Sequence, residues 1–154
     1  MAFESLTDQK IYELITCSKR LTNLNIKGKT EDGYEKFNYK VTARDYEFEV
    51  YRRQNMREGM EDDFSCGIRW LAPSGETLTL KRYNGPSHNH KNQIEKTILG
   101  PVCHVHIATE RYIQANRKAE GFAETTDRYH TVDGALHCLV KDCEISGILT
   151  SRDI

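Results

Sequence analysis

Two stretches between residues 35 and 83 alternate apolar and polar side chains with a period of two, and this alternation restricts the chain to a sheet-containing fold. In residues 35–50, aromatic and aliphatic residues at every second position are separated by lysine, asparagine, threonine and glutamate. Such alternation is typical of antiparallel strands that have one buried and one solvated face. We therefore predict a pair of antiparallel strands that turns near Arg44 and Asp45.

A second hairpin is predicted over residues 64–83. Residues 72–75 at its centre include a proline, which presets its own φ, and a glycine, which accepts positive φ, as tight turns require. Residues 54–63 and 84–100 are polar and are predicted to be loops. A fifth strand is predicted over residues 102–108.

Helices are predicted towards both ends of the chain. Residues 5–20 begin with a capping-box pattern and continue with an apolar stripe of helical spacing. Thr109 can cap a helix over residues 110–119, and Thr131 can cap a last helix whose apolar residues share one face.

The order of these elements, strands in runs with helices at the ends, favours an α+β fold. The chain has 154 residues, which is the length of one ordinary domain, and 38% of them are hydrophobic, which is enough to bury one core. We expect a single domain over residues 1–154, with an N-terminal helix, an antiparallel sheet of about five strands, and one or two C-terminal helices.

Charge and cysteine content limit the classes of partner. The 22 basic and 23 acidic side chains nearly cancel, so net charge gives no general reason for binding to nucleic acid or to an anionic membrane, although a local basic patch remains compatible with it. No apolar run approaches the roughly 18 residues of a spanning helix, and no secretory signal is recognised. Five cysteines without C-x-x-C spacing favour reduced thiols, and we expect a cytoplasmic protein with no membrane association.

The histidines are concentrated in one part of the sequence. Four of the six, at positions 88, 90, 104 and 106, fall within nineteen residues. His104 and His106 lie in the predicted fifth strand, where side chains at i and i+2 share a face and stand about 6–7 Å apart. We expect both on the face away from the core, with Cys103, Val105 and Ile107 on the other. The loop that carries His88 and His90 directly precedes this strand and can bring them near the first pair.

Three interpretations of these histidines remain open. In the first they are solvated or hydrogen-bonded side chains of an exposed strand. In the second, His88, His90, His104 and His106 bind a transition metal such as zinc, because neutral imidazole is a common ligand of such ions.

The third interpretation is general acid–base catalysis without a cofactor. Two histidines can remove one proton and donate another, which is what metal-free RNA cleavage requires. In this reading His104 and His106 are the acid and the base, and Arg82 stabilises the charge that develops on the phosphate. His88 and Tyr83 are auxiliary groups.

A second cationic feature is the run of Arg52, Arg53 and Arg57 beside Tyr51. Such a run can contact phosphates. Most charge runs are solvated strand ends, however, and that interpretation is favoured here.

The segment 78–108 carries a family resemblance. It reads Leu-Thr-Leu-Lys-Arg-Tyr-Asn-Gly-Pro-Ser-His-Asn-His, then a polar spacer, then Gly-Pro-Val-Cys-His-Val-His-Ile-Ala. This pattern resembles a group of small bacterial and phage proteins, and also the TumE-type toxins of toxin–antitoxin modules, which pair an Arg-Tyr-Asp-like strand end with a His-rich loop and a later His-x-His. The positions shared with these proteins are Arg82, Tyr83, Asn84, His88, His104 and His106. Asn84 stands where many relatives have an acidic residue.

The resemblance implies a toxin-like protein that acts on RNA. The first functional hypothesis is therefore a toxin-like endoribonuclease, with RNA as a possible ligand and a protein partner, either an antitoxin or an inhibited target. The second is a metal-binding protein or metal-dependent hydrolase that uses the same four histidines. The third is a non-catalytic phage or mobile-element protein that inhibits a partner by surface contact, which the near-neutral net charge slightly favours over a free-standing RNA enzyme.

Overall fold

The computed structural model describes residues 3–23 and 25–150 of the chain. In this part the three helices are α1 (Asp8–Thr16), α2 (Glu110–Gln114) and α3 (Val132–Asp142). The strands are β1 (Lys19–Leu21), β2 (Lys29–Glu31), β3 (Tyr34–Ala43), β4 (Tyr46–Asn55), β5 (Phe64–Leu71), β6 (Thr77–Asn84), β7 (His90–Asn92), β8 (Thr97–Leu99), β9 (His104–Ile107), β10 (Phe122–Thr125) and β11 (Ile145–Ser146). The α+β class is confirmed, but the number of strands exceeds the five that we expected.

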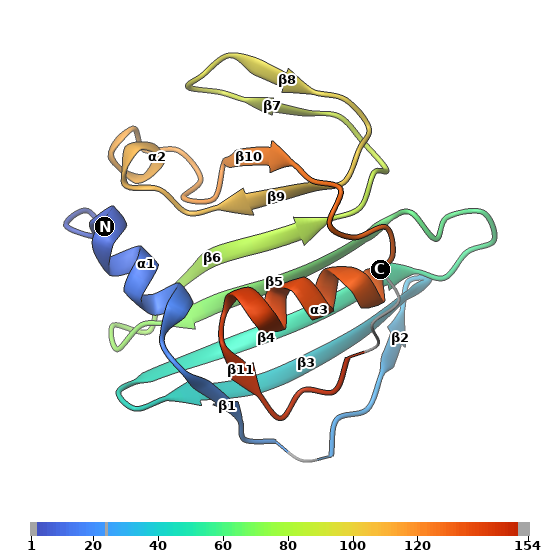
Figure 1. Cartoon of the computed structure of the whole chain (residues 1–154), viewed down its shortest axis with the longest axis horizontal. Coiled ribbons are helices and arrows are strands. Elements are labelled where there is room, and N and C mark those ends of the chain that lie inside the picture. The colour runs from blue at the N-terminus through green and yellow to red at the C-terminus, as the bar shows by residue number, and fades with distance from the viewer. Residues whose placement is uncertain (1–2, 24, 151–154) are drawn as a thin grey trace.

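Most strands belong to one large sheet (Figure 1), in the order β10-β9-β6-β5-β4-β3-β1-β11, with β2 paired to the end of β3. Its neighbouring strands are antiparallel except β1 and β11, which are parallel. Strands β7 and β8 form a separate hairpin within the segment predicted to be a loop. In Figure 1 this hairpin lies beyond the β10 edge of the sheet.

The two hairpins predicted from alternation form the centre of the sheet. Ala43 pairs with Tyr46, so β3 turns into β4 at Arg44 and Asp45 as predicted. Strands β5 and β6 are joined by the proline–glycine turn, in which Gly75 has a φ of +91°. A glycine adopts that conformation without the steric cost that a Cβ would add.

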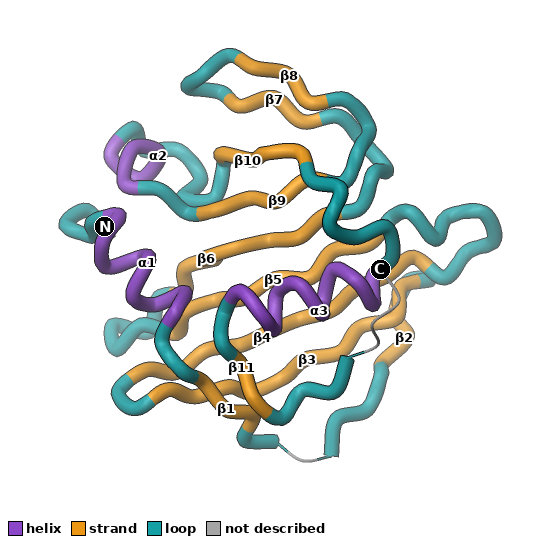
Figure 2. Tube along the Cα trace, viewed as in Figure 1, coloured by secondary structure: helices purple, strands orange, loops and turns teal. Residues whose placement is uncertain are grey.

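Helices α1 and α3 cover one face of the sheet (Figure 2). Thr131 caps α3 as predicted, accepting a hydrogen bond from the backbone N–H of Gly134 at 3.0 Å. Helix α1 is shorter than the predicted 5–20, because Thr7 is its N-cap and Cys17 already has extended backbone angles. No helix in residues 3–23 and 25–150 combines the length and the apolar character needed to cross a membrane.

The core lies between these helices and the sheet. Its helical part consists of Ile11, Leu14 and Ile15 of α1 and the apolar face of α3. In β3, β4 and β5 every second residue points into it, and the alternate residues point to the opposite face, as strand geometry requires. In β6 a register shift opposite Ile68 and Arg69 interrupts this alternation between Leu80 and Tyr83. The sheet residues in the core include Tyr39, Val41, Phe48, Val50, Cys66, Ile68, Leu78, Leu80 and Tyr83.

A buried lysine joins the two ends of the described chain. Lys19 is 3% exposed, and its Nζ donates to the backbone oxygens of Ile15, Cys17 and Cys143 at 2.7, 2.9 and 2.8 Å. Burial lowers the pKa of this lysine, and the nearby groups oppose that shift only in part. One ammonium group thus supplies donors to carbonyls at the C-terminal ends of both α1 and α3, which would otherwise be unsatisfied.

Candidate functional site

The sheet face opposite α1 and α3 carries a groove of about 620 Å³. Its lining comes mainly from β3, β4, β5 and β6 and includes four cationic side chains and one carboxylate that point to this face. The cations are Lys36, Arg53, Arg69 and Arg82, and the carboxylate is Asp63, whereas the side chain of Arg52 points to the α3 face and pairs there with Asp133. A chain with a net charge of −1 therefore has one strongly cationic depression.

The floor of the groove depends on a glycine, which has no side chain. Gly67 of β5 is buried, and a Cβ at this position would collide with the ring of Tyr51 from β4. The Tyr51 hydroxyl lies 3.3 Å from the Oγ of Ser65, and the guanidinium of Arg69 lies 4.4 Å from the Tyr51 ring centroid. An aromatic ring beneath a guanidinium is a surface on which planar groups can stack.

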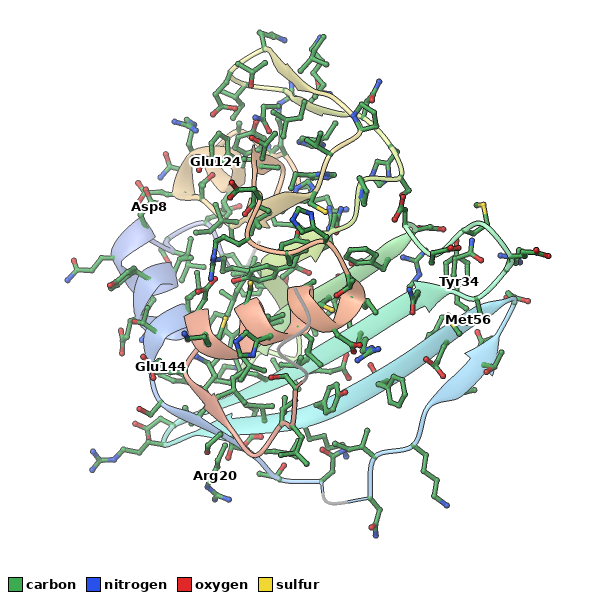
Figure 3. The ribbon with its side chains drawn as sticks, turned by 45° about the vertical axis from the view of Figure 1, so that its right-hand side comes forward. Asp8, Arg20, Tyr34, Met56, Glu124 and Glu144 are labelled. Atoms are coloured by element: carbon green, nitrogen blue, oxygen red, sulfur yellow. The ribbon has the colours of Figure 1, made fainter. Side chains whose placement is uncertain are left out.

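Several of these cations are already engaged by neighbours. Arg69 pairs with Glu49 at 2.7 Å, and Arg82 pairs with Glu120 at 3.3 Å. Arg53 lies 4.2 Å from the ring centroid of Tyr34, the first residue of β3, which is labelled in Figure 3. These contacts hold the guanidinium groups in place.

The groove carboxylate Asp63 is held by neighbouring donors. Its Oδ2 accepts from the hydroxyl of Tyr34 at 2.6 Å and from the amide of Asn55 at 3.1 Å. Partial burial raises the pKa of Asp63, but these hydrogen bonds outweigh that effect, so the pKa lies below its usual value.

Four imidazoles meet at the β6–β9 side of this face. We call His88, His90, His104 and His106 the histidine cluster. The ring centroids of His104 and His106 are 5.1 Å apart, and His90 lies 5.8 Å from His104 and 4.6 Å from His106. His88 stands edge-on to His104 at 5.7 Å and also lines the groove.

His104 and His106 share one face of β9, while Val105 and Ile107 point to the core side, as the alternation predicted. The first interpretation, in which the histidines are side chains of an exposed strand, is wrong for His104 and His106. They are 0% and 3% exposed. The β7–β8 hairpin packs beside them and places the ring of His90 against both.

Hydrogen bonds identify which ring nitrogens carry protons. A carbonyl oxygen only accepts, so the nitrogen facing it must donate. His104 donates from Nδ1 to the oxygen of Val102 at 2.9 Å, and His106 donates from Nδ1 to the oxygen of Glu120 at 2.8 Å. In their neutral forms both rings therefore keep a lone pair on Nε2.

The environment holds both rings in the neutral form. Burial, reinforced by the positive charge of Arg82, lowers the pKa of His106 to about 3. Burial likewise lowers the pKa of His104, and the hydrogen bond to Val102 offsets this only in part. At neutral pH these two imidazoles can accept a hydrogen bond or a proton, but they hold no second proton to donate.

The metal interpretation gains no support from the arrangement of ligands. Among the residues that the structure describes, no three His, Cys, Asp or Glu side chains are placed so that they could share a metal ion. The histidines that we proposed as ligands, His88, His90, His104 and His106, are close in space but do not form such a group.

Arg82 and Asn84 connect the histidine cluster to the groove. Both line the groove, and they pair across the sheet with His106 and His104 respectively. Arg82 donates from Nη1 to Glu120 at 3.3 Å, and its buried Nε has no partner within the described residues. Asn84 is 6% exposed, and its Nδ2 lies 3.5 Å from Nε2 of His104.

Tyr83 does not belong to this site, although we predicted it as an auxiliary group. It lies between Arg82 and Asn84 on a strand, so its side chain points to the opposite face. There it is fully buried, and its hydroxyl donates to Asp142 of α3 at 2.6 Å. Burial raises the pKa of Tyr83 far above its usual value, which makes it a structural group.

Sequence reasoning missed most of the groove. Lys36 and Arg69 were not singled out, and Arg52 and Arg53 were interpreted as a solvated strand end. The signal that could have found it is the set of polar positions in the alternating strands, because four adjacent strands place lysine and arginine on the same face. No protein-family model, curated protein or solved structure matches this chain.

Proposed function

We propose that the protein binds single-stranded RNA in the cationic groove and cleaves it without a metal ion. The observation that carries this proposal is the position of His88, Arg82 and Asn84 in the lining of a groove with four cations and one carboxylate. Neighbouring strands lie about 4.8 Å apart, so cations on successive strands form a track for a chain of phosphates. The Tyr51 ring and its stacked guanidinium add a surface for a base.

The proposed chemistry is attack by a ribose 2′-oxygen on the adjacent phosphorus. The 2′-hydroxyl proton passes to His88 as the new P–O bond forms, and the bond from phosphorus to the 5′-oxygen breaks. The departing 5′-oxygen takes a proton from water, and the hydroxide that forms removes the proton from His88, leaving a 2′,3′-cyclic phosphate, a 5′-hydroxyl end and neutral His88. Arg82 stabilises the negative charge on the phosphate oxygens, the role already expected for it.

This assignment gives His88 the role first considered for His104 and His106. His88 is exposed and lines the groove, whereas the other two are covered. We assign His104 and His106 to the support of Asn84 and Arg82. The protein partner, an antitoxin or an inhibited target, and the toxin-like effect on growth are parts of the same proposal.

The test combines binding and cleavage of a fluorescent single-stranded RNA. Arg69→Ala should weaken binding about fivefold or more, as loss of a charged hydrogen-bond donor does, whereas Arg44→Ala, at the exposed β3–β4 turn, should leave it unchanged. His88→Ala should abolish cleavage and retain binding, and a chelator should have no effect. If wild-type protein binds RNA no better than the roughly 100 μM limit of non-specific association, the proposal fails.

A second candidate is the non-catalytic inhibitor that acts by surface contact. The complete burial of His104 favours it, because a histidine that is 0% exposed can serve the fold alone. RNA that stays intact, together with a growth defect that His88→Ala does not relieve, would support this alternative. Inhibition by the chelator would instead restore the metal hypothesis.

A further inference from the structure

Two buried polar atoms in the groove lining have no partner in the described residues: Oδ1 of Asn84 and Nε of Arg82. Buried polar groups without a hydrogen bond lower the stability of the folded state, so native proteins rarely keep them without a function. Asn84 and Arg82 are two residues apart on β6 and share its groove face, which places them about 6–7 Å from each other. One is an acceptor and the other a donor.

The orientation of the Asn84 amide follows from its neighbours. The Nδ1 of His104 donates to the oxygen of Val102, so Nε2 presents a lone pair. Only the NH₂ end of an amide can face a lone pair favourably, and Nδ2 of Asn84 does lie 3.5 Å from this nitrogen. The oxygen is thereby turned away from His104. The contacts from Val102 through His104 to Asn84 therefore fix Oδ1 of Asn84 as an acceptor in the groove lining.

Arg82 is oriented in a similar way. Glu120 is 5% exposed and engages Nη1, which leaves the Nε side of the guanidinium for a ligand. A guanidinium can bind phosphate oxygens through this edge. The two unpartnered atoms therefore suit a ligand that carries a hydroxyl donor close to a phosphate.

We propose that Asn84 is a specificity residue that accepts a hydrogen bond from the 2′-hydroxyl of the nucleotide on the 3′ side of the scissile phosphate, not from the attacking 2′-hydroxyl, while Arg82 binds that phosphate and His104 is the positioning residue for Asn84. The 2′-hydroxyl distinguishes RNA from DNA at a given site. This inference rests on the proposed RNA binding and names the feature of the strand that is recognised. It also gives a buried, neutral histidine a role that needs no proton transfer.

The test compares three fluorescent single strands of one base sequence: RNA, DNA and 2′-O-methyl RNA. Binding is measured by anisotropy in the His88→Ala background, in which the RNA should stay intact. RNA should bind about three- to tenfold more tightly than either of the other strands, which is the factor that one net hydrogen bond supplies. Asn84→Ala should remove this preference by weakening the RNA complex, with the DNA complex unchanged within twofold.

Two further variants separate positioning from folding. His104→Ala should lose the RNA preference as Asn84→Ala does, and His104→Gln, whose side-chain oxygen can accept from the Asn84 amide, should restore part of it. Asn89→Ala removes an exposed asparagine close to β7 and should keep the full preference. If Asn84→Ala or His104→Ala does not fold, the comparison of RNA with 2′-O-methyl RNA still tests whether the 2′-hydroxyl acts as a hydrogen-bond donor.

The outcomes distinguish the two proposals. If all three strands bind tightly and Asn84→Ala changes none of their affinities, the role of Asn84 is overturned and RNA binding stays in place. Binding of none of them overturns the proposed function. A preference for RNA that survives Asn84→Ala assigns the recognition to another residue and also overturns this inference.

Discussion

The side-chain amide of Asn92 satisfies both main-chain groups of Ala123. The backbone N–H of Ala123 donates to Oδ1 of Asn92 at 2.8 Å, and Nδ2 of Asn92 donates to the oxygen of Ala123 at 2.9 Å. Asn92 belongs to β7 and Ala123 to β10, the edge strand of the sheet. A side chain therefore takes the place of a neighbouring strand, and it holds the β7–β8 hairpin beside the histidine cluster.

Replacing Asn92 by alanine should loosen this hairpin. The change leaves two buried main-chain groups unpaired at about 1–3 kcal/mol each, so we expect the free energy of unfolding to fall by about 2–4 kcal/mol. Urea unfolding measures this loss. Diethyl pyrocarbonate should also modify His104 and His106 faster in Asn92→Ala than in wild type. Asn89→Ala is the control, and an equal loss of stability in both variants would contradict the role of the Asn92 amide.

Gly67→Ala should disturb the floor of the groove. The added Cβ meets the ring of Tyr51, which must shift and release Arg69 and Ser65. Overpacking of this kind costs about 1–3 kcal/mol. Chemical denaturation provides the measurement, and Gly100→Ala, where nothing lies within 4 Å of the added atom, should change stability by less than about 0.5 kcal/mol. A Gly67→Ala protein as stable as Gly100→Ala would show that Tyr51 is free to move.

The buried His106 should make the protein less stable in mild acid. Its pKa is about 3 in the folded protein, against about 6.5 in an unfolded chain, so the unfolded chain takes up the proton first as the pH falls. The stability that depends on neutral His106 is fully present above about pH 6.5 and is lost progressively as the pH falls towards 3. Between pH 7 and pH 5 the loss from this residue is about 2 kcal/mol, at about 1.4 kcal/mol per pKa unit.

Urea unfolding at the two pH values tests this expectation. His106→Gln keeps a donor for the Glu120 oxygen and should flatten the pH dependence. His130→Gln, at an exposed position, should leave it as in wild type. Identical pH profiles for His106→Gln and wild type would mean that other groups govern the acid sensitivity.

The salt dependence of the RNA affinity should distinguish the charged contacts of the groove from the neutral contact of Asn84. Each phosphate contact to a single strand contributes about −0.7 to the slope of log K against log salt concentration. Arg53→Ala and Arg69→Ala should each make the slope shallower by about that amount, whereas Asn84→Ala should leave it unchanged. Affinities measured between 50 and 200 mM salt give these slopes. A slope that none of the variants changes would place the RNA outside this groove.

The central hairpins could be predicted because their signal is local. Alternation over eight or ten residues defines both the strand and its buried face, as β3 to β6 show. Strands β1, β2, β7, β8, β10 and β11 have two to four residues and, unlike β9, show no clear alternation of apolar and polar side chains. Their pairing depends on tertiary contacts, such as Lys19 with Ile145.

The candidate site, like the fold, was predictable only where its signal is local in the sequence. The shared face of His104 and His106 follows from a two-residue period. Their burial does not, because it depends on the side chains of His90 and Asn92 reaching Gly121 and Ala123 from a segment with no alternation. The groove needs outward-facing residues from several strands at once, and on each strand alone these look like an ordinary solvated face.

The contacts of Lys19 also set an order for assembly during synthesis. The strand that begins at Lys19 pairs with β11, and its ammonium binds the oxygen of Cys143, which lies 124 residues later in the chain. While the ribosome is still making that region, Lys19 lacks one of its three acceptors and β1 lacks its parallel neighbour. The contacts that the first helix and β1 make with residues 143–146 can therefore form only after that region has emerged, whereas all residues of the central hairpins are present long before that point.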